Sequence, residues 1–300
     1  MYIGGQIPLT MSHNYVLPLM AAALYLVSCG TNDGTDAGAP QGANADQAEA
    51  RPLFLSVPAD SSGVLFTNTI VENQQQNYYT YEYMYNGGGV AVGDINNDGL
   101  PDLYFTGNLM PDKLYLNKGG MRFEDITASA IGEAGQQGWH TGVTMADVNN
   151  DGHLDIYVCR AGWYKEPEKR ANLLYINNGD LTFTESARSL GVADTTRSTQ
   201  GAFFDMDKDG DLDLFVINTP LQGPKLSNLD VERMIKERRS PTDRLYRNDN
   251  GRFTDITAEA GVWNMGYGLG VAISDYDGNG YPDIYVANDS TPNFLWENQG

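Results

Sequence analysis

Four short acidic turns are the part of this sequence best equipped for chemistry. Counted from its first residue, each turn carries Asp or Asn at positions 1, 3, 5 and 9, and Gly at position 6. The side chain at position 7 varies, so this position would contribute only its backbone carbonyl oxygen. At positions 1, 3, 5, 7 and 9 the turns contain Asp94, Asn96, Asp98, Leu100 and Asp102; Asp147, Asn149, Asp151, His153 and Asp155; Asp205, Asp207, Asp209, Asp211 and Asp213; and Asp275, Asp277, Asn279, Tyr281 and Asp283.

This spacing of oxygen atoms suits calcium. Calcium takes roughly six to eight oxygen ligands at about 2.3–2.6 Å, whereas magnesium demands a stricter octahedron and keeps several waters. Zinc prefers His and Cys ligands, which are absent from positions 1, 3, 5 and 9. Gly at position 6 lets the chain turn sharply beneath an ion. We therefore expect one Ca²⁺ in each turn, about four in all, with the carboxylate-rich third turn binding most tightly.

Two alternatives to this kind of calcium loop can be weighed from the residues. An EF-hand requires Glu at position 12, where this chain has Phe105, Val158, Val216 and Val286. Hairpin turns that bind nothing are also rich in Asp, Asn and Gly. However, like charges about 4 Å apart repel by roughly 1–4 kcal/mol per pair in water or near a protein surface. A turn without a cation has no reason to gather them, so metal binding is the favoured interpretation.

The turns belong to a longer repeat that must position them. Four segments begin at Gly89, Gly142, Gly201 and Gly270 and read GVAVGDINNDGLPDLYFTG, GVTMADVNNDGHLDIYVCR, GAFFDMDKDGDLDLFVIN and GVAISDYDGNGYPDIYVAN. Each is followed by a second piece (KLYLNKGG, LLYINNGD, RLYRNDNG, FLWENQG), and the first three continue into MRFEDIT, LTFTESA and GRFTDIT. The apolar runs lack the spacings of three and four that helices show. Four short strands in each repeat of roughly 50–70 residues predict an all-β fold, a β-propeller.

These motifs resemble those of the FG-GAP/VCBS repeat proteins with integrin-α-type calcium loops. From about Val64 to Gly300 the chain is most similar to bacterial members that carry an ASPIC/UnbV region and are related to cartilage acidic protein. The resemblance implies a propeller, commonly of about seven four-stranded blades, with calcium loops on one rim and partner-binding loops elsewhere. The literal FG and GAP peptides cannot be identified in the sequence, and four acidic turns are too few for a complete ring of blades. We therefore expect a partial propeller of about four repeats from a longer protein.

The N-terminal region predicts export and anchoring. Residues 15–27 are almost wholly apolar, too short to span a bilayer comfortably but suited to the core of a signal peptide. The sequence LVSC ending at Cys29 resembles a bacterial lipobox, which implies lipidation of Cys29, although no Lys or Arg precedes the apolar run. A buried helix with an incidental cysteine is the alternative.

These features give three predicted regions. Residues 1–29 would be a lipoprotein signal peptide, residues 30–52 a flexible tether, and residues 53–300 the propeller. The tether is predicted because residues 31–50 contain no large apolar side chain that could build a core. We expect the protein to be exported and lipid-anchored in the cell envelope, at the outer membrane.

Composition narrows the classes of partner. The 300 residues include 39 Asp and Glu against 19 Lys and Arg, a formal net charge of -20. Such a charge repels nucleic acid and anionic membrane surfaces, so contact with a membrane is expected only through the lipid on Cys29. Cys159 lies in an apolar strand pattern and is expected to be a buried free thiol rather than a partner of Cys29.

A row of alternating tyrosines precedes the first repeat. Tyr79, Tyr81, Tyr83 and Tyr85 would share one face of a strand. They could then form a platform for stacking carbohydrate, or, as we favour, pack against a neighbouring sheet.

The functional expectation is a non-catalytic adhesion or ligand-binding module for an extracellular protein or glycan. The sequence shows no Ser-His-Asp signature, phosphate-binding loop, GxGxxG after a strand, or HExxH. A glycan lyase or hydrolase is the alternative, with His140, Arg160, Tyr164 and Glu166 as spare candidates that no catalytic spacing unites. A structural subunit of an envelope complex is the third hypothesis.

Overall fold

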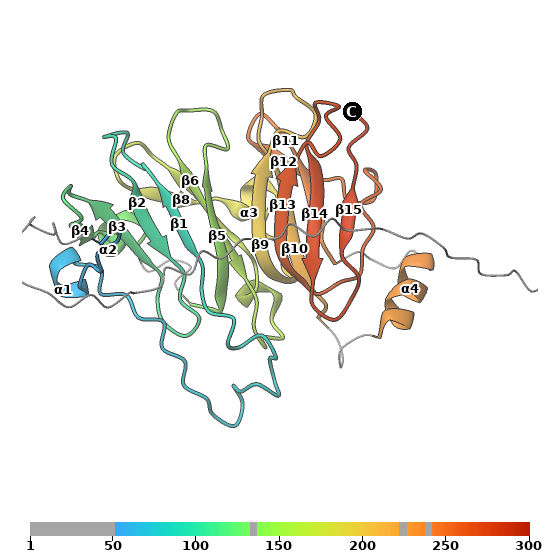
Figure 1. Cartoon of the computed structure of the whole chain (residues 1–300), viewed down its shortest axis with the longest axis horizontal. Coiled ribbons are helices and arrows are strands. Elements are labelled where there is room, and N and C mark those ends of the chain that lie inside the picture. The colour runs from blue at the N-terminus through green and yellow to red at the C-terminus, as the bar shows by residue number, and fades with distance from the viewer. Residues whose placement is uncertain (1–51, 133–136, 222–226, 238–241) are drawn as a thin grey trace, which may run out of the picture. The chain divides into compact units, whose positions relative to one another are not determined.

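Fifteen strands in the described part of the chain form four antiparallel sheets (Figure 1). The structure is a computed structural model that describes residues 52–132, 137–221, 227–237 and 242–300. The predicted signal peptide, Cys29 and residues 30–51 lie outside these ranges. Phe54–Gly300 forms one compact unit. No helix in the described ranges is both long and apolar enough to cross a membrane.

Each sheet is a meander whose strands pair in chain order. The first sheet comprises β1 (Val90–Gly93), β2 (Asp102–Phe105), β3 (Lys113–Asn117) and β4 (Phe123–Asp125), and the second β5 (His140–Ala146), β6 (Asp155–Arg160), β7 (Leu173–Asn177) and β8 (Phe183–Glu185). The third comprises β9 (Arg197–Phe204), β10 (Asp213–Thr219), β11 (Arg244–Asp249) and β12 (Arg252–Asp255), and the fourth β13 (Gly268–Ser274), β14 (Asp283–Asn288) and β15 (Phe294–Trp296).

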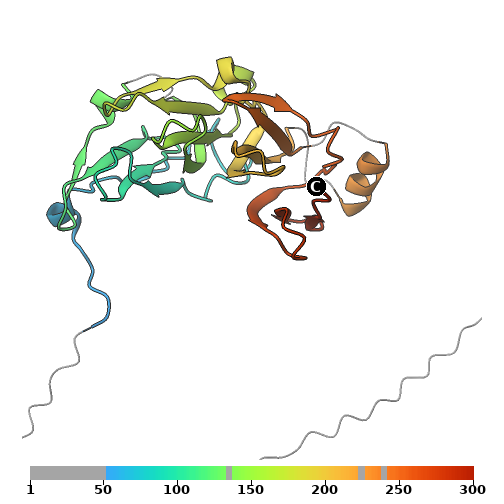
Figure 2. The same ribbon diagram turned by 90° about the horizontal axis from the view of Figure 1, so that it is seen from above.

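The sheets follow one another as propeller blades do. The first strand of each sheet lies beside the first strand of the next, β1 by β5, β5 by β9 and β9 by β13, and the view from above shows this succession (Figure 2). Helices are short: α1 (Ala59–Ser62), α2 (Thr127–Ala130), the 3₁₀ turn η1 (Pro167–Lys169), α3 (Ala187–Leu190) and α4 (Asn228–Lys236). The predicted all-β fold of propeller blades is confirmed.

Three hydrophobic clusters lie at the interfaces between successive sheets, and a fourth contains Tyr81, Met84, Trp139 and Ala161. The second strands supply much of each interface, such as Ile156 and Val158 against the first sheet and Phe215 and Ile217 against the fourth. Residues of the other strands and of the loops complete it. Cys159 is fully buried and unpaired, as expected. Burial raises the pKa of its thiol well above the ordinary value, so the thiol stays protonated.

A recurring Phe in the fourth strand belongs to the interface with the preceding sheet. Phe183 of β8 packs in the interface between the first and second sheets, and Phe253 of β12 in that between the second and third. Phe123 holds the same place in β4, where the described chain has no preceding sheet, and it is half-buried. The Phe of the FEDIT-like piece thus joins one blade to the blade before it.

In the first and third sheets, the Thr of the same piece closes the blade locally. Thr127 Oγ donates to Asp125 at 2.5 Å and accepts the backbone N–H of Leu114 at 2.9 Å. Thr257 makes the same pair of bonds with Asp255 and Leu245. This arrangement fixes the chain that leaves the fourth strand against the third strand.

A second clamp closes the turn between the second and third strands, next to the start of the third strand. Sequence reasoning missed it. The residue before each third strand accepts, through its side-chain oxygen, the N–H of a residue at or just beyond the end of the second strand, at 2.8–2.9 Å. These residues are Asp112, Asn172, Asp243 and Asn293. Asp and Asn are both acceptable there because only an oxygen acceptor is needed.

The tyrosine row does not form the predicted strand. Residues 78–80 and 82–85 form turns, so the four rings do not share one face. Tyr81 is 6% exposed whereas Tyr79 is 96% exposed. The reason is local, because Asn77 accepts the N–H groups of Tyr79 and Thr80 and holds the backbone in turns.

The interface role of the recurring Phe predicts unequal costs for the same substitution. We expect Phe253→Ala to lower the free energy of unfolding by about 3–5 kcal/mol, because it leaves a cavity between two sheets. Phe123→Ala should cost clearly less, because Phe123 is only partly buried and no preceding sheet is described beside it. Urea unfolding followed by circular dichroism measures both, and equal losses would contradict the assignment.

Candidate metal centres

The four acidic turns lie at the same end of their sheets, each between the first and second strands. They are also in contact with one another, because position 4 of each turn reaches position 7 of the next. Asn97 Nδ2 lies 3.3 Å from His153 Nδ1, and Asn150 Nδ2 donates to Asp211 at 2.9 Å. Lys208 Nζ lies 4.1 Å from the ring centroid of Tyr281. The side chains at position 7 of the second, third and fourth turns thus face the preceding turn.

The backbone of every turn has the same conformation. Position 4 has positive φ in all four turns, between 58° and 78°, and the Gly at position 6 has φ between 84° and 94°. The N–H of that Gly donates to the Asp at position 1, at 2.6–3.2 Å. The chain therefore folds around the first carboxylate, as a loop that wraps an ion must.

The Asp at position 9 fastens the turn to the rest of its sheet. It is buried in all four repeats, and its Oδ2 accepts the N–H of position 2 at 2.8–3.0 Å. Its Oδ1 accepts the N–H of an Asn at the end of the third strand or just beyond it, at 2.7–2.8 Å. Burial raises the pKa of Asp155 and of Asp213 to about 6 each, and nearby carboxylates of the same turn add to the rise.

The same Asn links neighbouring blades. Asn177 Nδ2 donates to the carbonyl of Ile95 at 2.8 Å, Asn248 Nδ2 to that of Val148 at 2.9 Å, and Asn298 Nδ2 to that of Met206 at 2.8 Å. Each acceptor is position 2 of the preceding turn. Sequence reasoning missed this role, although the Asn recurs visibly in KLYLN, LLYIN, RLYRN and FLWEN.

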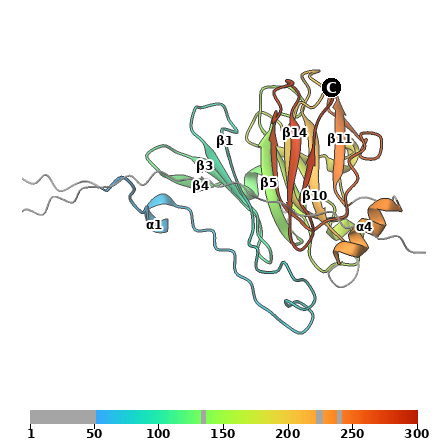
Figure 3. The same cartoon turned by 45° about the vertical axis from the view of Figure 1, so that its right-hand side comes forward.

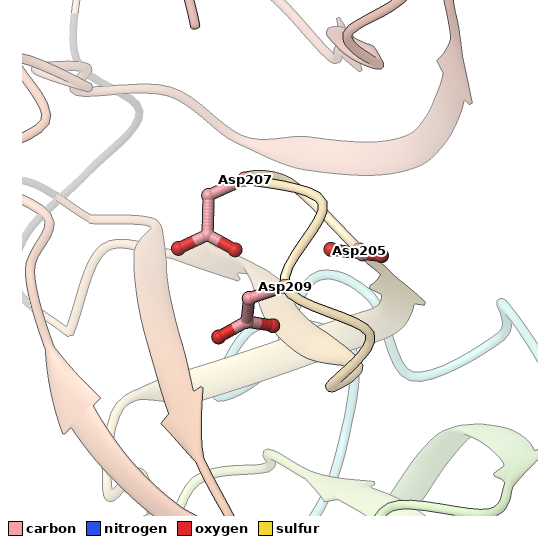
Figure 4. A group of neighbouring side chains, drawn as sticks. All are labelled: Asp205, Asp207 and Asp209. Carbon is pink, nitrogen blue, oxygen red and sulfur yellow. The ribbon is translucent and has the colours of Figure 1, made fainter.

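Two of the turns bring three carboxylates close together. Ligand oxygens of Asp205, Asp207 and Asp209 lie within 4.8 Å of one another (Figure 4), and so do those of Asp275, Asp277 and Asp283. Burial raises the pKa of Asp207, and the negative charges of Asp209 and Asp205 contribute. In the first and second turns, the Asn at position 3 instead donates to the Asp at position 5, at 3.0 and 2.8 Å.

One oxygen atom of the third turn indicates whether a cation would fit there. Asp205 Oδ1 is buried and has no hydrogen-bond partner among the residues that the structure describes. The same oxygen of Asp94 and of Asp147 accepts the N–H of position 5, at 3.1 Å. A buried carboxylate oxygen without a partner is costly. A hard cation held by the three carboxylates would satisfy it, so the donor set fits calcium.

Comparison with known proteins decides the family. The model of the FG-GAP-like repeat matches residues 94–158, 166–216 and 238–300, together more than half of the chain. The chain belongs to the FG-GAP repeat family. The matched segments contain all four acidic turns, so the recurring geometry described above is a property of FG-GAP repeats in this chain.

Curated relatives of this FG-GAP repeat chain are longer proteins. Cartilage acidic protein 1 of Xenopus tropicalis is 29% identical over 231 residues, which cover 76% of this chain and 32% of that protein. The Homo sapiens protein of the same name is 26% identical over 235 residues, covering 76% and 31%. Integrin alpha-8 of Gallus gallus is 27% identical over 230 residues, covering 70% and 20%. The chain thus spans about a third or less of these relatives.

Among solved structures, the V. cholerae biofilm matrix protein Bap1 aligns over 66% of this chain and 23% of that chain. The identity is 18% and the TM-score 0.33. A similarity this low supports no inference.

Two of the four spare catalytic candidates are engaged in packing. His140 is 1% exposed, and its Nδ1 lies 2.7 Å from Asp112, which also accepts the hydroxyl of Tyr104 at 2.7 Å. Arg160 is 6% exposed and donates to the carbonyl of Ala171 at 3.0 Å. These groups hold strands and loops together away from solvent.

The Asn link between blades predicts a difference between two equivalent positions. Asn248→Ala removes the bond to Val148 and leaves that carbonyl buried, so we expect a loss of about 1–3 kcal/mol in the free energy of unfolding. Asn117 keeps the corresponding bonds within its own sheet, to Pro101 and Gly119, but no preceding sheet is described for it. Asn117→Ala should therefore cost less. Chemical denaturation compares the two, and the reverse order would refute the link.

Proposed function

We propose that this chain is a calcium-binding, non-catalytic β-propeller module of the bacterial cell envelope that binds an extracellular protein or glycan. The observation that carries the calcium assignment is the third turn, where three carboxylates converge and Asp205 Oδ1 is buried without a partner among the described residues. The FG-GAP family and the similarity to integrin alpha-8 support a binding module of this kind.

Calcium would act through the hydrogen bonds that anchor each turn. Position 2 of a turn donates to its own position 9, and in the first three turns it accepts from the Asn of the next blade. An ion held by positions 1, 3 and 5 would offset the repulsion among carboxylates within the turn. The residue at position 2 makes both bonds, one through its N–H and one through its carbonyl. Stabilising the turn would therefore also stabilise the strand that carries position 9 and the contact with the next blade. Calcium is thus proposed to stabilise the scaffold that displays the ligand-binding loops.

We propose no catalytic role, because the candidate residues His140 and Arg160 are buried rather than open to a substrate. Asp and Glu side chains concentrate in the turns, and His140 and Arg160 lie buried in packing networks. A non-catalytic module needs only a rigid scaffold and an exposed surface, and function must be argued from such a site rather than from the fold.

The cellular location is proposed from the N-terminal sequence. A short apolar run that ends at Cys29 supports export and lipid attachment to the outer membrane, and residues 30–52 would tether the blades to the lipid. The membrane would be contacted only through that lipid. Nucleic acid is not proposed as a partner, because the chain carries a formal net charge of -20.

Calcium removal tests the metal assignment. We expect millimolar calcium to raise the melting temperature relative to chelator, because an ion at about a hundred times its dissociation constant adds roughly 2.7 kcal/mol per site. Asp207→Asn should weaken binding at the third turn, because it removes a charge while keeping an oxygen, as Asn149 does in the second turn. Titration calorimetry and elemental analysis measure affinity and bound ion.

Glu259→Gln is the matched control, since it removes the same charge from an exposed position outside the turns. It should leave calcium binding unchanged. The calcium assignment fails if the protein melts at one temperature in calcium and in chelator and carries no bound ion.

Replacement of the predicted lipidation site tests the anchor. In a bacterial host, the wild-type chain should lose residues 1–28 and partition into detergent, because a lipid attached to Cys29 buries its chains there. Cys29→Ser should stay unprocessed and unlipidated. Intact-mass spectrometry of the detergent-extracted protein distinguishes the two, and a wild-type mass without lipid would exclude the anchor.

A further inference from the structure

The segment that leads into the first blade crosses to the other three blades. We call residues 72–89 the strap. Figure 3 shows the chain before β1 running below the sheets, at the end away from the C-terminus. Gly300 lies beside Tyr281 of the fourth acidic turn. The strap therefore lies where the first strands begin, whereas the acidic turns follow the ends of those strands.

Contacts from two tyrosines fasten the strap. Tyr81 packs edge-on against Trp139, just before β5, with ring centroids 5.5 Å apart, and Arg197 at the start of β9 lies 5.9 Å from the Tyr81 ring. The hydroxyl of Tyr83 donates to Asp289, just after β14, at 3.2 Å. One segment thus touches the second, third and fourth blades.

Asparagine side chains give the strap a fixed shape. Asn73 Oδ1 accepts the N–H groups of Gln75 and Gln76 at 2.9 Å each. Asn77 Oδ1 accepts the N–H of Tyr79 at 3.0 Å, and its Nδ2 donates to the carbonyl of Asn73 at 3.0 Å. Such bonds hold the first part of the strap in turns, ahead of the residues from Tyr81 onward that line a cavity.

A cavity of about 480 Å³ lies between the strap and the first strands. Its size falls within the roughly 300–1,000 Å³ usual for small-molecule sites. Its polar lining includes Tyr83, Asn86, Thr141, Thr199 and Gln200. Backbone is exposed at the glycines of residues 87–89, and no charged side chain lines the cavity, although the chain is strongly acidic.

We propose that this cavity binds a neutral saccharide, which would be the glycan ligand of the module proposed above. Sugar hydroxyls both donate and accept hydrogen bonds, as do the amides of Asn86 and Gln200 and the hydroxyl of Thr199. Tyr83 offers an aromatic surface to the apolar C–H groups of a sugar ring. An anionic glycan finds no cation in this lining and is repelled by the net charge.

Gln200 is the residue to test. Its Nε2 donates to the carbonyl of Gly201 at 3.2 Å, and its Oε1 lies beside Gly142, which also lines the cavity. The carboxamide can therefore both donate to and accept from a ligand hydroxyl. Gln75 provides a matched position, since it is an exposed glutamine on the strap that does not line the cavity.

The experiment presents the full chain, in millimolar calcium, to an array of neutral hexose and N-acetylhexosamine oligosaccharides and their sulfated and uronate counterparts. The neutral oligosaccharide bound most strongly is then titrated by calorimetry. We expect retention of neutral glycans and a loss of roughly tenfold or more in affinity for Gln200→Leu, as removal of paired hydrogen bonds produces. Gln75→Leu should bind like the wild type, and thermal melting should show both variants folded.

Several outcomes would overturn the proposal. These are no retained neutral glycan, preference for anionic glycans, wild-type affinity in Gln200→Leu, or selection from a random peptide library of a binder that Gln200→Leu abolishes. The calcium assignment has its own readout, since the cavity lies away from the acidic turns. Glycan binding without a calcium effect on melting would refute the calcium assignment and leave the saccharide proposal standing. A calcium effect without glycan binding would refute only the saccharide proposal.

Discussion

The structure of this chain depends on one buried carboxylate in each repeat. The Asp at position 9 accepts a backbone N–H from its own turn on one oxygen and an N–H of the third strand on the other. Both bonds are made to a charged acceptor in a site shielded from water, where hydrogen bonds are strong. Because the same carboxylate joins the turn to the third strand, the position of the acidic side chains follows from how each sheet folds.

That constraint explains how a chain of small sheets can hold a row of equivalent sites. Each blade buries its second and third strands against its neighbours. The Asn whose N–H is bound by the position-9 carboxylate also donates a hydrogen bond to the preceding turn. The rim with the acidic turns is thereby fixed by packing and by direct bonds. The opposite end of the sheets is closed differently, by a strap whose tyrosines reach three other blades. Metal chemistry and ligand recognition are thus proposed at separate ends.

Much of this arrangement could be predicted from the sequence because the motifs are repeated. The acidic turns, the strand pattern and the free Cys159 were predicted correctly as elements, since each depends on residue types at short spacing. The Asn bonds between blades could not be predicted, because their acceptors are backbone carbonyls of another sheet. The tyrosine row was misread because alternation predicts a strand, whereas Asn73 and Asn77 compete for the backbone and bend it.

The direction of the Asn bonds has a consequence for the order in which the blades mature. The donor always lies in the later blade and the acceptor in the earlier one. A ribosome releases the earlier blade first. Its position-2 carbonyl must remain hydrated until the Asn of the following blade emerges, so the rim of every blade is completed only by its successor. A blade that lacks its successor would thus keep one backbone carbonyl open to water at its rim.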